Sequence, residues 1–205
     1  HMDNPPDVMH WTYPLPVRIK GVPNIYTIHD LVPLKLPYTT LDNKRYYYRL
    51  IKQCIAHGAR ICTVSEQSQR DIENMFPESQ GKIVNTYQAA QLETNVLKQD
   101  QKELDRDLQG LFSLNSGEYF LFFGAIEPKK NVGRLIEAYL ASQIETPLII
   151  AGSQAWKSKE ELKLYTSLTQ GNPSIQKKIR LLGYLPYPFL VKLIRGAKAV
   201  VFPSL

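Results

Sequence analysis

The chain has 205 residues, of which 43% are hydrophobic and 21% are charged, and this globular composition excludes a fibrous or a disordered protein. No apolar run reaches the roughly 18 residues that a membrane span needs, and the first residues show no secretory signal, so we expect a cytoplasmic protein. The net charge of +6 suits an anionic ligand or surface, but no RNA- or DNA-binding signature is present, so no nucleic-acid partner is expected.

The two cysteines, Cys54 and Cys62, are too few for a disulfide framework. Cys54 and His57 lie close in sequence, but a single further cysteine gives a poor match to zinc-ligand spacing. We therefore expect two reduced, buried cysteines and no metal site.

Short apolar runs alternate with helical patterns along the chain, which predicts an α/β fold with mostly parallel strands. In the first part, strands are expected at Asn24–Ile28, Arg60–Val64 and Lys82–Tyr87. Between the first two, apolar residues with a 3.6-residue period predict a helix that packs on the sheet: Tyr47, Leu50, Ile51, Cys54 and Ile55. Ser65 is a suitable N-cap for a helix that Pro77 would end.

The pattern weakens over residues 91–116, where polar residues dominate and Leu104, Leu108 and Leu111 predict only one modest helix. We expect an interdomain connection there, between a domain in residues 1–90 and a second domain in residues 117–205.

In the last part, strands are expected at Tyr119–Phe123, Leu148–Ala151, Ile179–Leu182 and Ala199–Phe202. Two amphipathic helices are expected between them, with these apolar residues facing the sheet: Leu135, Ile136, Tyr139 and Leu140 in one, and Phe189, Leu190, Leu193 and Ile194 in the other. The first part opens in a proline-rich stretch and the last strand runs to the C-terminus, so we expect both domains to be truncated in this chain.

One segment places cations where α/β sheets bind phosphates. A buried strand ends at Gly124, a short loop delivers Lys129 and Lys130, and a helix starts near Asn131. The lysines would therefore lie beside the positive end of a helix, at the carboxyl end of a parallel strand. The segment is neither a Walker A loop nor a G-x-G-x-x-G fingerprint, and the absent fingerprint disfavours a nicotinamide-dependent oxidoreductase. A solvated basic turn explains it equally well, and the residues alone leave both interpretations open.

Two further strand ends carry candidate binding residues. A strand breaks at His29-Asp30, where the histidine could bind a substrate hydroxyl or phosphate, or where Asp30 could simply cap the turn while His29 satisfies a backbone group. Another strand ends at Gly183, and Tyr184 and Leu185 then form a turn that could hold a nucleotide base or be an ordinary βα turn.

Taken together, these segments resemble family 4 of the retaining glycosyltransferases, which has the two-Rossmann-domain fold called GT-B. The resemblance runs from Asp7 to Leu205 and rests on six segments in the family's order: His29-Asp30, Thr63–Glu66, Phe123–Asn131, Ile149–Gly152, Leu182–Leu185 and Val201–Ser204. It implies transfer of a hexose from a nucleoside diphosphate sugar to a hydroxyl acceptor, with retention at the anomeric carbon. The nucleotide sugar would be a substrate, and neither a cofactor nor a metal is implied.

The resemblance also implies roles for individual residues. His29 would contact the donor sugar from the opposing domain as the catalytic candidate, and Lys130 would bind the donor diphosphate with help from Lys129. The remaining candidates for donor binding are Gly124, Asn131, Tyr184, Leu185 and Ser204.

The chain departs from the family pattern in three places. Ala125 stands where many members have an arginine, the family continues past Leu205 into a Glu-Gly-Phe-Gly segment, and the family's opening strands would precede Asp7. A non-catalytic nucleotide-binding or interaction fragment of such an enzyme is therefore the alternative interpretation.

Donor and acceptor are less constrained. The segment Ile126–Asn131 is similar to that of mannosyltransferases of polysaccharide assembly, which favours GDP-mannose over UDP-sugars, and the acceptor would be a glycan or a lipid-linked sugar. The basic and aromatic helix Lys44–Leu50 would suit peripheral contact at the inner membrane face, but an amphipathic core helix with a solvated basic face also explains it.

Overall fold

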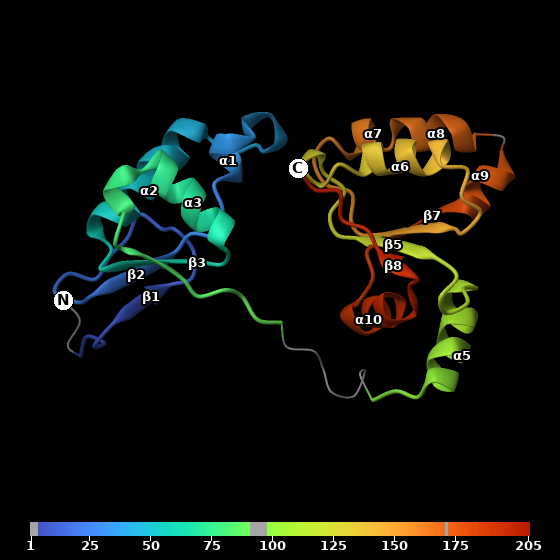
Figure 1. The fold of residues 1–205 in the computed structure, drawn as a ribbon, viewed down its shortest axis with the longest axis horizontal. Helices are drawn as coiled ribbons and strands as arrows, with labels where there is room; N and C mark the ends of the chain where they lie inside the picture. Colours follow the sequence, from blue (N-terminus) through green and yellow to red (C-terminus); the bar gives the residue numbers. More distant parts are fainter. Residues whose placement is uncertain (1–3, 91–97, 171) are drawn as a thin grey trace. The chain divides into compact units, whose positions relative to one another are not determined.

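A computed structural model describes residues 4–90, 98–170 and 172–205 (Figure 1). The chain divides into two compact units between Ala90 and Gln91, and each is described by itself. The sequence predicted an interdomain connection over residues 91–116. Residues 91–97 lie outside the described residues, and this division assigns residues 98–116 to the second unit.

The first unit contains a parallel sheet in the order β1-β2-β3-β4, formed by Met9–Trp11, Asn24–Thr27, Arg60–Thr63 and Ile83–Asn85. The three predicted strands are confirmed with slightly shorter ends. Strand β1 was not predicted, because three residues in a proline-rich stretch give no periodic signal. It forms because its backbone pairs in register with β2, Met9 opposite Asn24.

The helices of this unit are α1 (Val32–Lys35), α2 (Lys44–His57) and α3 (Glu66–Met75), with short 3-10 turns η1 (Pro37–Thr39) and η2 (Pro77–Ser79). All five residues of the predicted apolar face of α2 are buried in one core with β2 and β3. The predicted N-cap is confirmed, because the Ser65 hydroxyl accepts a hydrogen bond from the Ser68 backbone N–H at 3.1 Å. Helix α3 ends before Pro77, as expected.

The second unit contains a parallel sheet in the order β7-β6-β5-β8, formed by Ile179–Gly183, Leu148–Ala151, Phe120–Phe123 and Ala199–Val200. All four strands were predicted, but β8 is shorter than expected. The backbone N–H of Val201 still donates to Leu121 at 2.8 Å, whereas the ring of Phe202 packs on those of Phe122 and Phe123.

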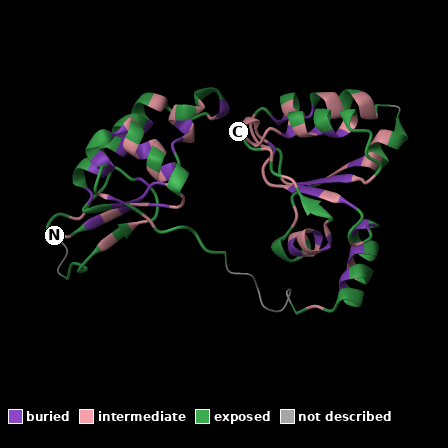
Figure 2. Cartoon of the chain, in the orientation of Figure 1, coloured by how far each residue is buried: buried purple, intermediate pink, exposed green. Residues whose placement is uncertain are grey.

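Helices cover both faces of this second sheet (Figures 1 and 2). Leu121 and Ile149 face a core shared with α5 (Gln101–Phe112) and α10 (Tyr187–Gly196). Phe122 and Ile150 alternate with them and face the core of α6 (Val132–Ala141) and α8 (Lys163–Thr169). The remaining short elements are η3 (Pro128–Lys130), α7 (Ser158–Glu161) and α9 (Pro173–Lys178).

The predicted faces of α5 and α10 were each wrong at one residue. Leu111 is 50% exposed, and the neighbouring Phe112 is buried in its place. Phe189 is exposed in the first turn of α10, where Val191 and Leu193 supply the buried face. In α5 and in α10, apolar residues are adjacent in the sequence at the position concerned. The helical period alone therefore could not show which of the adjacent residues is buried.

Helices α5 and α10 contact each other closely. Lys192 Nζ lies 2.6 Å from Asp107 Oδ2, and hydrogen bonds from Lys192 and Gln99 hold the pKa of the Asp107 carboxyl below its ordinary value. A Cβ atom at Gly196 would lie 2.3 Å from Leu108 Cδ1, so the Leu108 side chain would have to move if another residue stood there. None of the helices in the described ranges is long and apolar enough to cross a membrane.

Candidate functional site

A glycine stands at the carboxyl end of each of three neighbouring strands in the second unit. Gly124, Gly152 and Gly183 have φ angles of 133°, 154° and 68°, which disfavour other residues. The Gly152 N–H donates to the Gly183 carbonyl at 2.7 Å, and the Gly124 N–H donates to Ala151 at 2.9 Å. The sheet therefore ends in a closely packed backbone edge without side chains.

This edge forms the wall of a pocket of about 220 Å³. Its apolar lining comes from Phe123, Leu185 and Leu190, and Tyr184 stands at it 75% exposed to solvent. The other lining residues are Gly124, Ala125, Ala151, Gly152 and Ser153. An apolar lining beside a wall of glycine backbone suits a heterocyclic ring that stacks on apolar side chains. The structure thus brings Gly124, Tyr184 and Leu185 together, as the sequence suggested.

The two candidate lysines follow directly after β5, in the 3-10 turn η3, and differ in their surroundings. Lys129 Nζ lies 3.4 Å from Glu127 Oε1, so its charge is balanced locally. Lys130 is half-buried, and its ammonium group has no hydrogen-bond or ion-pair partner within the described ranges. Lys130 is therefore the lysine whose charge is available to an anion.

The N-terminus of α6 lies next to these lysines. Asn131 has a left-handed backbone, with φ 57°, and α6 begins at Val132. The Gly133 N–H donates to Glu161 Oε2 at 2.8 Å, so a carboxylate already caps this helix end. An anion at this end of the sheet would therefore depend more on Lys130 than on the helix itself.

The last residues of the chain lie against the same loop. Asn131 Nδ2 donates to the Pro203 carbonyl at 3.2 Å, and the Leu205 N–H donates to the Lys129 carbonyl at 3.0 Å. Ser204 stands between these two contacts and is exposed. Lys129, Asn131 and Ser204 are thus neighbours, although none of them lines the pocket beside Gly124.

In the first unit, His29 follows β2 with its ring partly buried. Its backbone carbonyl accepts a 2.6 Å hydrogen bond from the Ser68 hydroxyl, but its Nδ1 is buried and unpartnered within the described part of the chain. Asp30 Oδ1 accepts from the Val32 N–H at 3.0 Å, which confirms that Asp30 caps the turn. His29 itself is left with an unused ring nitrogen, which is rare for a structural histidine.

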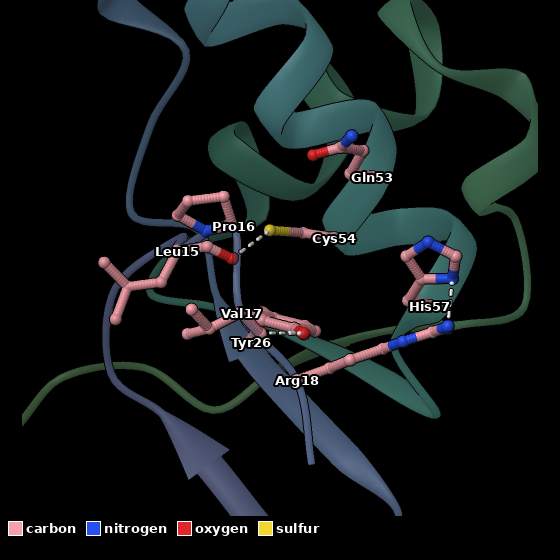
Figure 3. A pocket seen from close by; sticks show the side chains of 8 residues that line it. All are labelled: Leu15, Pro16, Val17, Arg18, Tyr26, Gln53, Cys54 and His57. Atoms are coloured by element: carbon pink, nitrogen blue, oxygen red, sulfur yellow. Dashed lines mark hydrogen bonds between the residues drawn. The ribbon is translucent and has the colours of Figure 1, made fainter. Parts of the chain in front are cut away.

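A second pocket, of about 160 Å³, lies in the first unit and was not predicted (Figure 3). Most of its polar side chains are hydrogen-bonded to other lining residues. Arg18 Nη1 lies 2.8 Å from His57 Nδ1, the Tyr26 hydroxyl donates to Val17, and the Cys54 thiol contacts the Leu15 carbonyl at 3.7 Å. Burial raises the pKa of the Cys54 thiol to about 11, so it stays protonated. The Gln53 amide, which also lines the pocket, has no hydrogen-bond partner within the described residues and is the polar group left for a ligand.

Sequence reasoning missed part of the pocket beside Gly124. Phe123, Gly152, Ser153 and Leu190 line it but were not candidates. A glycine directly after a buried strand marks Gly152 as well as Gly124, so that signal was available. Leu190 gives no such signal, because it reaches the pocket only through the packing of α10.

Comparisons with known proteins show which proteins this chain is similar to. Residues 106–205 match the family model described as Glycosyl transferases group 1. Over 195 residues the chain is 30% identical to O-antigen chain mannosyltransferase B of Escherichia coli, a match that covers 93% of this chain and 49% of that protein. It is 22% identical over 200 residues to the serotype-specific mannosyltransferase WbdA of Escherichia coli, covering 92% of this chain and 24% of that protein.

Among solved structures, the chain is similar to Anabaena HepE in complex with UDP and glucose. The TM-score is 0.70 at 16% identity, and the match covers 89% of this chain and 47% of that one. The chain thus spans about half the length of mannosyltransferase B and HepE, and about a quarter of WbdA. These comparisons support the glycosyltransferase family for this chain, whose α/β fold is of the expected GT-B type.

Proposed function

We propose that this chain belongs to a retaining hexosyltransferase of family 4 that transfers mannose from GDP-mannose to a hydroxyl of a glycan or lipid-linked acceptor. The mannosyltransferase relatives support the sugar and the role in polysaccharide biosynthesis. The neighbour solved with UDP and glucose supports a nucleotide-sugar donor. The proposed reaction needs no metal, and we place it in the cytoplasm.

The observation that carries the proposal is the unpartnered ammonium group of Lys130, in the turn η3 that follows β5 and Gly124. In transfer from a nucleoside diphosphate sugar, negative charge builds up on the departing diphosphate. A fixed cation near this group stabilises the transition state more than the ground state. Lys130 would supply that charge, while Lys129 contributes less because Glu127 already balances it.

The neighbouring pocket is proposed to hold the nucleotide base. The ring would lie against Tyr184 and Leu185, with the backbone of Gly124 and Gly152 at the pocket wall. Asn131 and Ser204 would border the diphosphate, because both lie at the loop that carries the lysines.

Replacing Lys130 with alanine is expected to weaken nucleotide binding by at least about tenfold, the loss of one hydrogen bond to a charged group. Calorimetric titration of the full chain with GDP, UDP and ADP would measure this and identify the preferred base. Lys177→Ala is the matched control, since it removes an exposed lysine from α9. Equal affinities of the Lys130 variant and wild type would contradict the proposal.

His29 is proposed to contact the donor sugar through its other ring nitrogen, Nε2, since Nδ1 is buried. His29→Ala should therefore lower affinity for GDP-mannose by about fivefold, the value of one ordinary hydrogen bond, and leave GDP binding unchanged. His57→Ala, an exposed histidine of the same unit, serves as the control. An equal loss for GDP and GDP-mannose would count against a sugar contact.

The alternative is a non-catalytic fragment that only binds nucleotide. Release of free mannose or transfer to a sugar acceptor from labelled GDP-mannose distinguishes the two. Nucleotide binding without either product would favour the fragment.

A further inference from the structure

The outward face of helix α2 carries a concentration of positive charge. The helix contains Lys44, Arg45, Arg49 and Lys52 and no acidic residue. Arg45, Arg49 and Lys52 follow the i, i+4, i+7 spacing, so they form one stripe on the side opposite the buried face. The exposed helices α3 and α5 instead mix both signs of charge, as solvated surfaces commonly do. Unlike α3 and α5, α2 therefore carries charged side chains of one sign only.

The three stripe residues are exposed, and none has a hydrogen-bond or ion-pair partner in the described part of the chain. Two other cations of the same unit are engaged in ion pairs. Lys35 Nζ lies 2.6 Å from Asp71, and Arg70 lies 3.0 Å from Glu66. The stripe is thus available to an anionic partner.

The position of Arg45 also works against the helix. The first turn of α2 contains no acidic residue, although the positive end of the helix dipole favours one there. Lys44 is held by the Thr40 carbonyl at 2.8 Å, but Arg45 gains no such contact. The Asn43 side chain caps this helix end by accepting a hydrogen bond from the Tyr46 N–H at 3.0 Å, and Arg45 adds positive charge there without adding a contact.

Large apolar side chains lie beside the stripe. Leu41 is 76% exposed just before α2, and Tyr46 is 55% exposed within it. Tyr38 in η1 and Tyr48 in α2 are also exposed. Tyrosine next to lysine and arginine is the composition of surfaces that lie at the water–lipid interface, where rings insert and cations meet anionic headgroups.

We propose that this α2 face, made of Leu41, Arg45, Tyr46, Arg49 and Lys52, docks on an anionic lipid bilayer. The proposal does not depend on nucleotide binding, because every residue that carries it lies in the first unit. Charge attracts the stripe to anionic headgroups, and the neighbouring apolar side chains enter the interface.

Co-sedimentation of the full chain with vesicles tests this proposal. Neutral phosphatidylcholine vesicles are compared with vesicles that also contain phosphatidylglycerol, near 0.1 M salt. Wild type should bind only the anionic vesicles. Replacing Arg45, Arg49 and Lys52 together with glutamine should lower the partition constant roughly 100-fold, about fivefold for each cation. Leu41→Ser with Tyr46→Ser should also reduce binding.

The matched control removes three exposed cations from the second unit, by Lys98→Gln, Lys102→Gln and Arg106→Gln. It changes the net charge equally and should retain most of the binding. Equal losses in both triple variants would overturn a specific surface. Binding of wild type to soluble heparin but not to anionic vesicles would also overturn the proposal, in favour of a soluble polyanion. GDP titration of the stripe variant should be unchanged, which separates this test from that of the donor site.

Discussion

Replacing Gly152 with alanine is expected to destabilise the second unit by about 3 kcal/mol or more. A Cβ atom at this position would lie 1.8 Å from the Gly124 carbonyl oxygen, and φ is 154°. Because the contact is with backbone, β5 and β6 must separate to relieve it, which adds overpacking to backbone strain. Urea unfolding followed by hydrogen exchange of the β5 and β6 amides measures the loss.

Gly124→Ala separates the clash from the strain. Its φ of 133° is also unfavourable, but the nearest heavy atom to a new Cβ is Phe122 Cζ at 4.0 Å. We expect a cost of about 1 kcal/mol from strain alone. If the two variants were equally stable, the close approach of Gly124 and Gly152 would not constrain the sheet edge.

Asn24→Ala is expected to destabilise the first unit by about 3 kcal/mol. Asn24 is 4% exposed, and its amide makes four hydrogen bonds. Its Oδ1 accepts from Trp11 Nε1 and the Ile19 N–H, both at 3.0 Å, while its Nδ2 donates to the Ile19 and Val22 carbonyls at 2.9 and 2.7 Å. Truncation leaves these buried groups without partners, and each costs roughly 1–3 kcal/mol unless water replaces it.

Trp11 reports this loss directly, since its indole bonds to Asn24. In a Trp156→Phe background, urea unfolding followed by fluorescence isolates the first unit. Asn85→Ala is the control, because Asn85 supports only the exposed Tyr87 turn and should cost less than about 1 kcal/mol. A loss for Asn24→Ala no greater than that of the control would mean that this network does not hold β1 and its following loop.

The strands from β2 to β7 could be predicted because each is a short run of branched or aromatic residues in a buried parallel sheet. Strand β1 could not, because its stability comes from pairing with β2 and from the Trp11–Asn24 bond rather than from its own residues. In α5, Leu111 and Phe112 are both apolar, and only the position of α10 decides which is buried.

The part of the candidate site that is formed by consecutive residues could be predicted from the sequence. Gly124, Lys129, Lys130 and the start of α6 follow one another, so the strand–turn–helix pattern positions them. The partners that distinguish the two lysines and cap α6 were not predictable. Glu161 reaches Gly133 from α7, and the contact between Gly124 and Gly152 joins two strand ends. Such contacts depend on the packing of separate elements.

The central claim is that a nucleoside diphosphate binds at the glycine edge of the second unit. An amide NMR titration of the labelled chain with GDP tests it most directly. The account predicts saturable shifts at Gly124, Lys130, Gly152 and Tyr184, with no comparable shifts around Arg18 and His57. Shifts confined to the pocket of the first unit, or no shifts at saturating GDP, would contradict it.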